Sequence, residues 1–498
     1  MTDRTGDPPG AEHRPRRPDA WTALLLAVPV VVVLVLLAFA AADPALGVTV
    51  SNGPFTDESW DVMNARNFVL LGRWATDDWT LQLVNLPFSL SAAAVFSVLG
   101  VGIVQARLVS IAATGVTVAA LGLGLRRPLG AGPAAIAALA FGGATLVLYY
   151  GRLAFLEPSV AMWLTLGALA ALRAGGERAG RWGVLAGVLL ALAVGTKPSA
   201  LAAVGGLVAA VAVVGARQAA VRRWVAGVAL AIAALGGAWL VLFWLPNRTE
   251  ISNVLRIWAS EPIIAPIRTV LSRVASFPAR NDGFIAQSAP ILAAGTAGWL
   301  AGALRWRRLS TEVRLLLAAA TGWAVAGLGL LAVAPYRPNR YEEPLLPAFA
   351  ILAGIGVSAV AGSRALYPRR RALLAGTALA LVLVVPGAAA YAGWMRVATY
   401  RLPTVQAETL AAIPAGSATQ GTYAPAFAMR AHVLTIVSRP ADQISPGDLY
   451  ATRSVRWFID ADNAAPAWAS SHPAAWAARQ AVLCSPWGTS RVCVYRLP

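Results

Sequence analysis

Long apolar runs are the feature that most constrains how this chain can fold. They recur from Trp21 to Tyr391, and several reach about 17–25 residues, enough to cross a hydrocarbon core of about 30 Å. Hydrophobic residues make up 58% of the sequence and charged residues 13%, compared with roughly 45–50% and about 25% in soluble domains. The sequence therefore predicts an all-α polytopic membrane protein.

Arginine-rich loops indicate the orientation of the expected spans. The net charge is +18 at pH 7, but the basic residues gather in short loops, where they mark the cytoplasmic side of a membrane. The charge therefore indicates topology, and we expect no nucleic-acid partner. The clusters are Arg126–Arg127; Arg173, Arg178 and Arg181; Arg217, Arg222 and Arg223; Arg305, Arg307, Arg308 and Arg314; and Arg364 with Arg369–Arg371.

We expect about eleven transmembrane helices, with the N-terminus in the cytoplasm. The stretch 86–100 is short and contains Pro87 and several serines. A crossing there would turn every later arginine cluster outward, so this stretch is predicted to be an interfacial helix. The expected spans are 21–42, 104–125, 132–149, 154–173, 182–195, 198–216, 224–245, 288–304, 314–334, 344–362 and 371–392.

The composition divides the chain into three parts. Residues 1–19 are predicted to form a disordered cytoplasmic tail. Residues 20–393 form the transmembrane domain, with a catalytic first outer loop at 43–103. Residues 394–498 form a small extracytoplasmic C-terminal α/β domain, with strand-like runs AHVLTIV, SVRWFID and RVCVYRLP. Cys484 and Cys493 suit a disulfide in an exported segment, and two free thiols are the alternative.

The first outer loop carries a group of acidic residues, Asp57, Glu58 and Asp61, after Thr56. Thr56 is placed to cap a short helix, and acidic residues in a first turn suit the helix dipole. Capping alone is therefore one interpretation. The other is that a carboxylate at the membrane surface accepts a proton from an incoming hydroxyl or amine, as a general base does.

The second outer element is the hairpin YYGRLAFLEPSV, which contains Arg152 and Glu157. Glu157 falls at the outer end of an expected span, where an ionisable group is costly and usually functional. Arg152 is expected to pair with Glu157 or to contact a phosphate group. A purely structural pair of these two residues is the alternative.

The third outer element is the hairpin GTKPSA, whose Lys197 is the only lysine among 41 lysine and arginine residues. Pro198 disfavours the helical region for Lys197, so an extended turn is expected there. Lysine is a compact charge on a flexible stem, whereas the planar guanidinium of arginine needs more room. We therefore expect Lys197 to contact a phosphate in a narrow space, with a simple interface anchor as the alternative.

The fourth outer element is the loop PYRPNRYEEP, with Arg337, Arg340 and Tyr341. Two arginines on a proline-stiffened loop can hold a phosphate bidentately, although a Tyr/Arg anchor at the membrane edge is the alternative. All four elements lie on one side of the membrane, and the arginine clusters that give this topology are independent of them.

Several of these motifs together resemble a known family. They are the acidic pair of the first outer loop, Asn85–Pro87, Arg107, GRLAFLEP, a Thr-Lys-Pro hairpin and RYEEPLLPAFAILAG. Over roughly residues 20–360 the chain resembles the GT-C membrane glycosyltransferases, of the protein O-mannosyltransferase and lipid A aminoarabinose transferase type.

The resemblance implies a GT-C fold and transfer of a sugar from a polyprenyl-phosphate donor to an extracytoplasmic glycan, lipid or protein, with inversion. It implies that Asp57 is the base, with Glu58 beside it, and that Lys197 and Arg340 are near the donor phosphate. Glu157 stands where the family usually has an aspartate.

We therefore expect a multi-pass glycosyltransferase in the cytoplasmic membrane of a bacterium, in contact with membrane lipids. No cofactor is expected, although Asp57, Glu58 and Glu157 offer oxygen ligands suited to Mg²⁺ or Mn²⁺. A transporter or flippase of a lipid-linked saccharide is the main alternative, but it predicts ionisable residues midway through several spans. A scaffold that binds cell-wall material would leave the charged outer face without a purpose.

Overall fold

The computed structural model describes most of the chain, and the following account concerns those residues only. The expected disordered tail at 1–19 lies outside them. The described residues are 20–44, 56–74, 85–248, 252, 266–280, 282–334, 338–361, 369–436, 454–462, 467–487 and 490–498.

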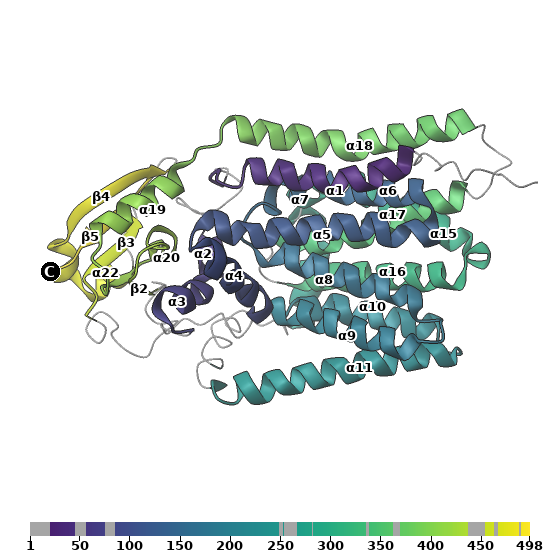
Figure 1. Ribbon diagram of the computed structural model, residues 1–498, viewed down its shortest axis with the longest axis horizontal. Helices are drawn as coiled ribbons and strands as arrows, with labels where there is room; N and C mark the ends of the chain where they lie inside the picture. The colour runs from purple at the N-terminus through teal and green to yellow at the C-terminus, as the bar shows by residue number, and fades with distance from the viewer. Residues whose placement is uncertain are drawn as a thin grey trace, which may run out of the picture.

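A bundle of roughly parallel and antiparallel helices forms the larger part of the molecule (Figure 1). Within the described ranges, 8 helices are long and apolar enough to cross a membrane. They are α1 (Ala20–Ala38), α5 (Ile103–Leu129), α9 (Ala179–Thr196), α11 (Ala219–Trp239) with its π-helical continuation η2 (Leu240–Trp244), α15 (Asp282–Leu304), α16 (Thr311–Val333), the 3-10 helix η4 (Asn339–Leu345) continuing into α17 (Leu346–Ala361), and α18 (Arg369–Arg396).

Shorter helices complete the bundle, and the all-α polytopic fold class is confirmed. The expected span 132–149 is broken into two helices at Gly143, where Gly387 of α18 packs directly against the backbone. The shorter helices are α6 (Ala131–Gly142), α7 (Thr145–Tyr150), α8 (Leu156–Ala170) with the 3-10 turn η1 (Ala171–Arg173), α10 (Ala200–Val214) and the 3-10 turn η3 (Trp306–Arg308).

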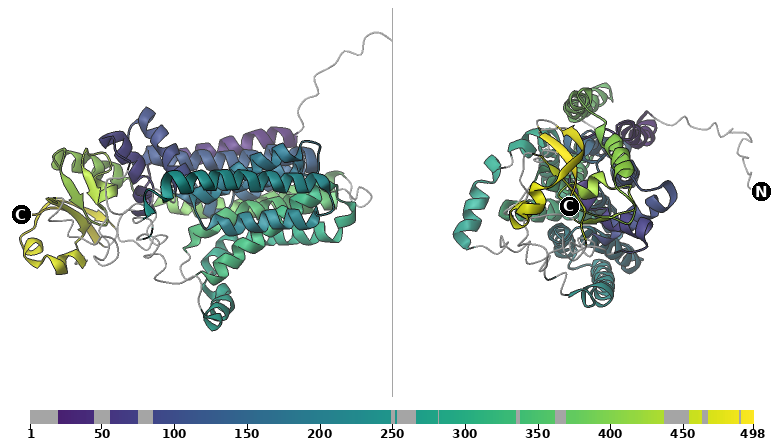
Figure 2. Two further views of the ribbon diagram at one scale, coloured as in Figure 1. Left: turned by 90° about the horizontal axis from the view of Figure 1, so that it is seen from below. Right: turned by 90° about the vertical axis from the view of Figure 1, so that its left-hand side faces the viewer.

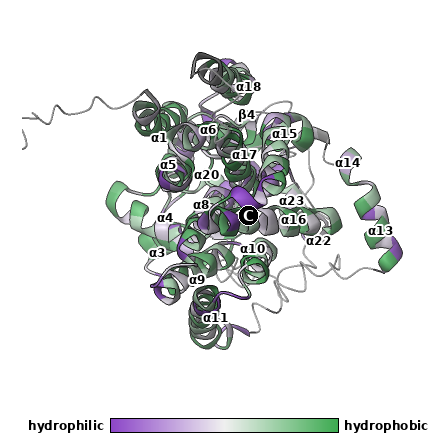
Figure 3. Cartoon of the chain, turned by 90° about the vertical axis from the view of Figure 1, so that its right-hand side faces the viewer, coloured by the Kyte–Doolittle hydropathy of each residue, from purple (hydrophilic) through white to green (hydrophobic). Residues whose placement is uncertain are grey.

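Small residues let the helices approach closely. A Cβ atom on Gly206 of α10 or on Gly322 of α16 would overlap the backbone carbonyl of the other glycine. Such contacts are typical of membrane helices, where packing replaces the hydrophobic effect between segments. The outer faces of the bundle are mainly apolar (Figure 3).

Helices of the loop at 43–103, called the first outer loop after its expected location, lie at one end of the bundle (Figure 1). They are α2 (Thr56–Trp60), α3 (Met63–Leu71) and α4 (Leu86–Leu99). The helix α4 coincides with the stretch predicted to be interfacial, and it packs against α3 and α5. Two further helices, α13 (Ile267–Ala275) and α14 (Phe277–Arg280), lie to the side of the bundle (Figure 3).

The C-terminal residues form a small α/β domain at the same end as α2 and α3 (Figure 2). Its five-stranded sheet has the order β2-β1-β3-β5-β4, in which β1 is parallel to β2 and β3 and the other pairs are antiparallel. The elements are α19 (Arg401–Ala412), β1 (Ala418–Gln420), α20 (Ala424–Phe427), β2 (Leu434–Ile436), β3 (Trp457–Ala461), α22 (Ala467–Ser471), α23 (Pro473–Ala477), β4 (Gln480–Trp487) and β5 (Ser490–Arg496).

The two cysteines face each other across β4 and β5. Cys484 and Cys493 are paired in register and form a disulfide. Of the two interpretations of the sequence, the disulfide is therefore the one that the structure contains. It joins the last two strands of a domain that has only a small hydrophobic core.

A buried arginine fastens the C-terminal domain to the first outer loop. Arg66 of α3 is 1% exposed. Its guanidinium donates hydrogen bonds to four carbonyl oxygens in the segment after α20, those of Ala428, Met429, Ala431 and Val433, at 2.5–3.0 Å. The carbonyls of Ala428 and Ala431 also accept backbone hydrogen bonds from Ala431 and Val433, at 3.0 and 2.9 Å. Arg66 thus adds donors to a buried, irregular segment in which backbone pairing is incomplete.

A second connection is made by Asp43, which follows α1. Its carboxylate accepts hydrogen bonds from the Thr399 hydroxyl at 2.8 Å and from the backbone N–H groups of Arg401 and Leu402 at 2.7 and 3.1 Å. The latter two are the first residues of α19, so Asp43 caps that helix from a distant part of the chain.

The Arg66 contacts lead to a prediction about the stability of this junction. Arg66→Ala removes four side-chain hydrogen bonds to these carbonyls and should destabilise the junction by on the order of 3 kcal/mol, because unsatisfied buried polar groups are costly. Hydrogen-exchange mass spectrometry of the purified protein should show faster exchange over residues 424–436. The exposed Arg430 provides the control, and parent-like exchange in Arg66→Ala would contradict the assigned role.

Candidate active site

Glu58 and Arg107 form a buried ion pair at the base of the candidate site. The Arg107 Nε and Nη2 atoms lie 2.7 and 2.8 Å from the two carboxylate oxygens of Glu58, a bidentate arrangement. Both side chains are 1% exposed. Glu58 Oε1 also accepts a hydrogen bond from the backbone N–H of Ala154 at 2.9 Å. Glu58 is therefore held in place on α2 by two other segments.

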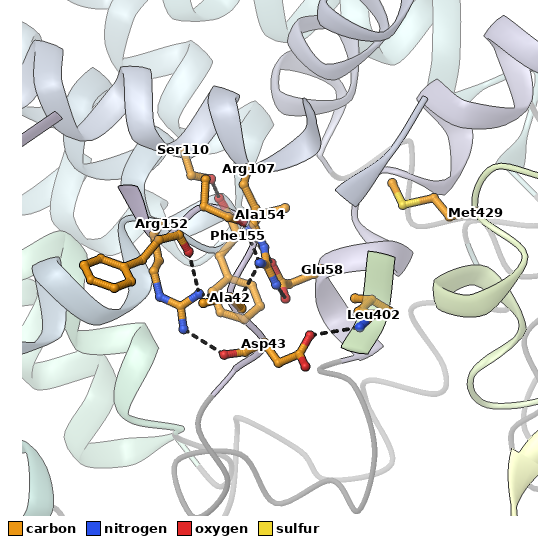
Figure 4. A network of polar contacts seen from close by, with 12 residues as sticks. Ala42, Asp43, Glu58, Arg107, Ser110, Arg152, Ala154, Phe155, Leu402 and Met429 are labelled. Atoms are coloured by element: carbon orange, nitrogen blue, oxygen red, sulfur yellow. Dashed lines mark hydrogen bonds and ion pairs between the residues drawn. The ribbon is translucent and has the colours of Figure 1, made fainter. Parts of the chain in front are cut away.

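Arg107 also holds the chain that follows α1. Its Nη1 atom donates to the carbonyl oxygens of Ala40 and Ala42 at 2.8 and 2.7 Å. A single guanidinium on α5 thus fixes the end of α1 and the carboxylate of α2 together (Figure 4). Asp57, the neighbour of Glu58, obtains its position from this network.

Arg152 is part of the same scaffold, and the expected pairing with Glu157 is wrong. Arg152 is fully buried and donates to the carbonyl oxygens of Ala42 and Asp43 at 2.7 and 3.1 Å (Figure 4). It precedes α8 and turns toward the end of α1, whereas Glu157 lies in the first turn of α8. The prediction that Arg152 contacts a phosphate in the same site as Glu157 finds no geometric support.

Glu157 instead pairs with Lys197. The Lys197 Nζ atom lies 2.5 Å from Glu157 Oε1. It also lies 3.3 Å from the centre of the Tyr341 ring, a cation–π contact. Lys197 follows the end of α9 in an extended conformation, with φ −152° and ψ 116°, as the following Pro198 predicts. The side chain of Lys197 is 12% exposed and that of Glu157 is 2% exposed.

Arg340 joins Asp57 to this pair. Its Nη2 atom forms an ion pair with Asp57, and its Nε atom lies 3.5 Å from Glu157 Oε1. Its guanidinium also lies near the rings of Phe155 and Tyr341, at 5.4 and 5.2 Å. The side chain of Asp57 is 28% exposed, which makes it the most accessible carboxylate of these ion pairs.

Five residues selected from the sequence therefore meet in three dimensions, although they come from four separate segments. These are Asp57, Glu157, Lys197, Arg340 and Tyr341, here called the charged cluster. Glu58 and Arg152 lie behind the cluster in the buried scaffold. Arg337 lies outside the described residues.

Two further carboxyl groups adjoin the charged cluster. Asp61 is buried, and burial raises the pKa of its carboxyl well above the usual value. The charges of Asp57 and Glu157 add to this rise, while Lys197 and Arg340 oppose it. The backbone carbonyl of Asp61 accepts a hydrogen bond from Asn85 Nδ2 at 3.1 Å, which fixes its position. Asp61 follows Asp57 by four residues, and this helical spacing is the sequence signal that the two carboxyl groups lie on the same side of the chain.

Glu343 is the other additional carboxyl group. It is fully buried and interacts electrostatically with both Glu157 and Lys197. In the described part of the chain neither of its carboxyl oxygens has a hydrogen-bond partner. In the sequence it is one of two adjacent glutamates, Glu342 and Glu343, and both are fully buried in the structure. Residue spacing alone does not tell which of them adjoins the charged cluster.

The cluster combines an accessible carboxylate with buried cations. Burial lowers the pKa of the Lys197 ammonium, while the Glu157 carboxylate opposes this effect.

Among the described residues, no three carboxylate, histidine or cysteine side chains are grouped so that they could hold a metal ion. Asp57, Glu58 and Glu157, which the sequence suggested as oxygen ligands, point to three different cations.

Comparisons of the sequence give no match to a family model or to a curated protein. The fold, however, is similar to solved structures. ArnT from Cupriavidus metallidurans bound to undecaprenyl phosphate has a TM-score of 0.68 and 17% identity, covering 95% of this chain and 98% of that one.

Two further solved structures with lower TM-scores are also named as sugar transferases. An oligosaccharyltransferase from Archaeoglobus fulgidus has a TM-score of 0.56 and 15% identity, covering 87% of this chain and 67% of its own. The mycobacterial arabinofuranosyltransferase AftD has a TM-score of 0.53 and 16% identity, covering 95% of this chain and 40% of its own. The fold that the sequence motifs predicted is therefore present: this chain has the fold of the GT-C membrane glycosyltransferases.

Proposed function

We propose that the chain is a membrane glycosyltransferase that moves a sugar from a polyprenyl-phosphate donor to an acceptor outside the cytoplasmic membrane of a bacterium. The observation that carries this proposal is the charged cluster, in which Arg340 links the Asp57 carboxylate to the Glu157–Lys197 pair. One cluster thus offers a proton acceptor and two cations for a phosphate. The structural similarity to ArnT bound to undecaprenyl phosphate supports the same donor class.

The chemistry follows from the properties of these groups. Asp57 takes the proton from the attacking hydroxyl or amine of the acceptor, as a general base. The attacking atom bonds to the anomeric carbon on the face opposite the phosphate, so the configuration inverts. The bond between this carbon and the phosphate oxygen breaks, and its electron pair stays on the phosphate. Lys197 and Arg340 stabilise that developing charge.

Donor binding also explains how Asp57 becomes available as a base. In the structure Arg340 forms an ion pair with Asp57. A donor phosphate competes for this guanidinium, because arginine binds phosphate through parallel, charge-assisted hydrogen bonds. When Arg340 turns to the phosphate, the Asp57 carboxylate is released to accept a proton.

The remaining expected site residues have supporting parts in this proposal. Glu58 is a positioning residue, because both of its carboxylate oxygens are held by Arg107. Tyr341 forms the wall against which the Lys197 ammonium lies. Arg337, three residues before Arg340, is proposed as a further phosphate contact. The acceptor class is a glycan, a lipid or a protein.

Asp57 and Glu58 should respond differently to loss of charge. Asp57→Asn should leave the fold and membrane insertion intact and reduce the transfer rate by at least about 10²-fold, the lower end of general-base contributions. Glu58→Gln should lower the thermal stability, because it leaves the buried Arg107 charge without its partner, at a cost of roughly 3–5 kcal/mol.

Transfer from a radiolabelled polyprenyl-phosphate sugar and thermal unfolding in detergent measure the two effects. Parent-like transfer by Asp57→Asn would remove Asp57 from the mechanism. An unchanged unfolding temperature for Glu58→Gln would remove Glu58 from the scaffold.

Lys197 should not be replaceable by arginine. Lys197→Ala and Lys197→Arg should both insert normally but bind undecaprenyl phosphate weakly, since the ammonium is confined between Glu157 and the Tyr341 ring. Binding of undecaprenyl phosphate to the purified variants tests this. If Lys197→Arg binds like the parent, Lys197 is only a positive anchor; if Lys197→Ala does, Lys197 is not in the site.

The proposed orientation places the charged cluster and the C-terminal domain outside the cell. The arginine-rich segments meet at the opposite end: Gly175 lies beside Gln218, which precedes α11, and beside Thr311, the first residue of α16. A topology reporter fused after residue 498 should therefore be active outside, and one fused near Arg178 should be active inside. A cytoplasmic signal from the C-terminal fusion would overturn the orientation.

A further inference from the structure

A groove on the side of the bundle is separate from the charged cluster. It has a volume of about 670 Å³ and lies between α1 and α18, with α6 and α7 forming its floor. Its walls are the apolar side chains of α1 from Leu24 to Val35, with Phe39 just after that helix, and of α18 from Val384 to Met395, with Arg396 at one end. The two helices flank this face of the bundle in both the side view and the end view (Figures 1 and 3).

The end of the groove nearest the C-terminal domain is positively charged. Arg396, the last residue of α18, is exposed there. The fully buried Arg152 lies behind Phe39, and its Nη1 atom lies 3.4 Å from the Phe39 carbonyl oxygen. Within the described part of the chain, neither arginine takes part in an ion pair.

A buried polar atom lies at the same end. Tyr391 lines the groove, and its ring meets that of Phe39 edge-on at 5.7 Å between centroids. Among the described residues, no group forms a hydrogen bond with the Tyr391 hydroxyl, and none does so with the Nε atom of Arg152. Of these two donors, the Tyr391 hydroxyl belongs to a residue that lines the groove.

The dimensions of the groove match a chain confined to one leaflet. The α1 wall from Leu24 to Phe39 spans roughly 22 Å and the α18 wall from Val384 to Arg396 roughly 18 Å, at about 1.5 Å per residue. Half of the hydrocarbon core measures roughly 15 Å, so the groove is long enough for an acyl chain of one leaflet. An apolar groove of at least this depth that ends in positive charge is complementary to a lipid with a single inserted chain and a phosphate at the top.

We propose that this groove binds an anionic glycerophospholipid of the leaflet next to the C-terminal domain, with one acyl chain between α1 and α18 and the phosphate at Arg396. The donor lipid is a less suitable occupant, because Lys197 follows α9 on the other side of the bundle from α18 (Figure 3). The site does not depend on the proposed sugar transfer.

Occupancy of the groove has a structural consequence. Phe39 and the three residues after it form the connection that directly follows α1. Carbonyl oxygens of this connection accept hydrogen bonds from Arg107 and Arg152. A bound acyl chain packs against Phe39 and stabilises this connection, and ligand binding to the folded state raises the unfolding temperature by mass action. The lipid would thus support the scaffold behind Asp57.

The charge of the headgroup gives the first test. Native mass spectrometry of the purified protein with added phosphatidylglycerol or phosphatidylethanolamine should show preferential retention of phosphatidylglycerol. Arg396→Gln should reduce this preference by about fivefold, equivalent to about 1 kcal/mol for one basic residue near a lipid phosphate. Arg248→Gln, an exposed arginine near the corresponding end of α11, is the matched control and should retain it. Equal loss in both variants, or in neither, would overturn the proposal.

The shape of the groove gives the second test. Phosphatidylglycerol with a photoreactive group in one acyl chain should label peptides of α1 and α18. Ala388→Phe fills the groove and should reduce this labelling several-fold, whereas Val385→Phe, at an exposed position outside the groove on the same helix, should not. Equal labelling in both variants would show only annular lipid and overturn the proposal. Displacement of the label by undecaprenyl phosphate at lower concentration would assign the groove to the donor, and would also overturn it.

Discussion

Much of the site depends on the charge of one buried residue, Arg107. A guanidinium without solvent is tolerated only when acceptors surround it, and here a bidentate carboxylate and two carbonyl oxygens do so. The carbonyls belong to the stretch after α1 and the carboxylate belongs to α2, so satisfying one charge determines where the chain after α1 passes and how α2 lies. Asp57 directly precedes Glu58 on α2, whose orientation is fixed by this network, and this gives the proposed base a defined direction.

In the charged cluster, the charges of two cations and two carboxylates compensate each other through ion pairs. Lys197 lies on Glu157, and Arg340 lies between Asp57 and Glu157. A charge pair buried near a membrane is stable only while each partner remains, so the cluster resists rearrangement until another ion replaces one partner. A phosphate is such an ion, since it offers several acceptor oxygens to both cations at once. Binding and activation are therefore parts of the same exchange in the proposed mechanism.

The sequence predicted the bundle and most of the cluster because both depend on strong local signals. Apolar length defined the spans, and Pro198 implied the extended backbone of Lys197. The prediction failed for Arg152, whose partner depends on where the chain after α1 passes in space. It named Asp61 only as a member of the acidic group, and it did not single out Glu343, because burial next to the cluster depends on neighbouring segments. The sequence therefore predicted local structure, but it did not predict which distant segments contact each other.

The attachments of the C-terminal domain define a practical unit of exchange. Arg66 holds the segment after α20, and Asp43 caps α19, so α3 and the end of the α1 segment are tied to the C-terminal domain. A chimera that swaps only residues 394–498 with a relative would separate each polar group from its matching backbone. Recombination of this architecture therefore has to transfer the first outer loop and the C-terminal domain as one inseparable module, although they are more than 300 residues apart in the sequence.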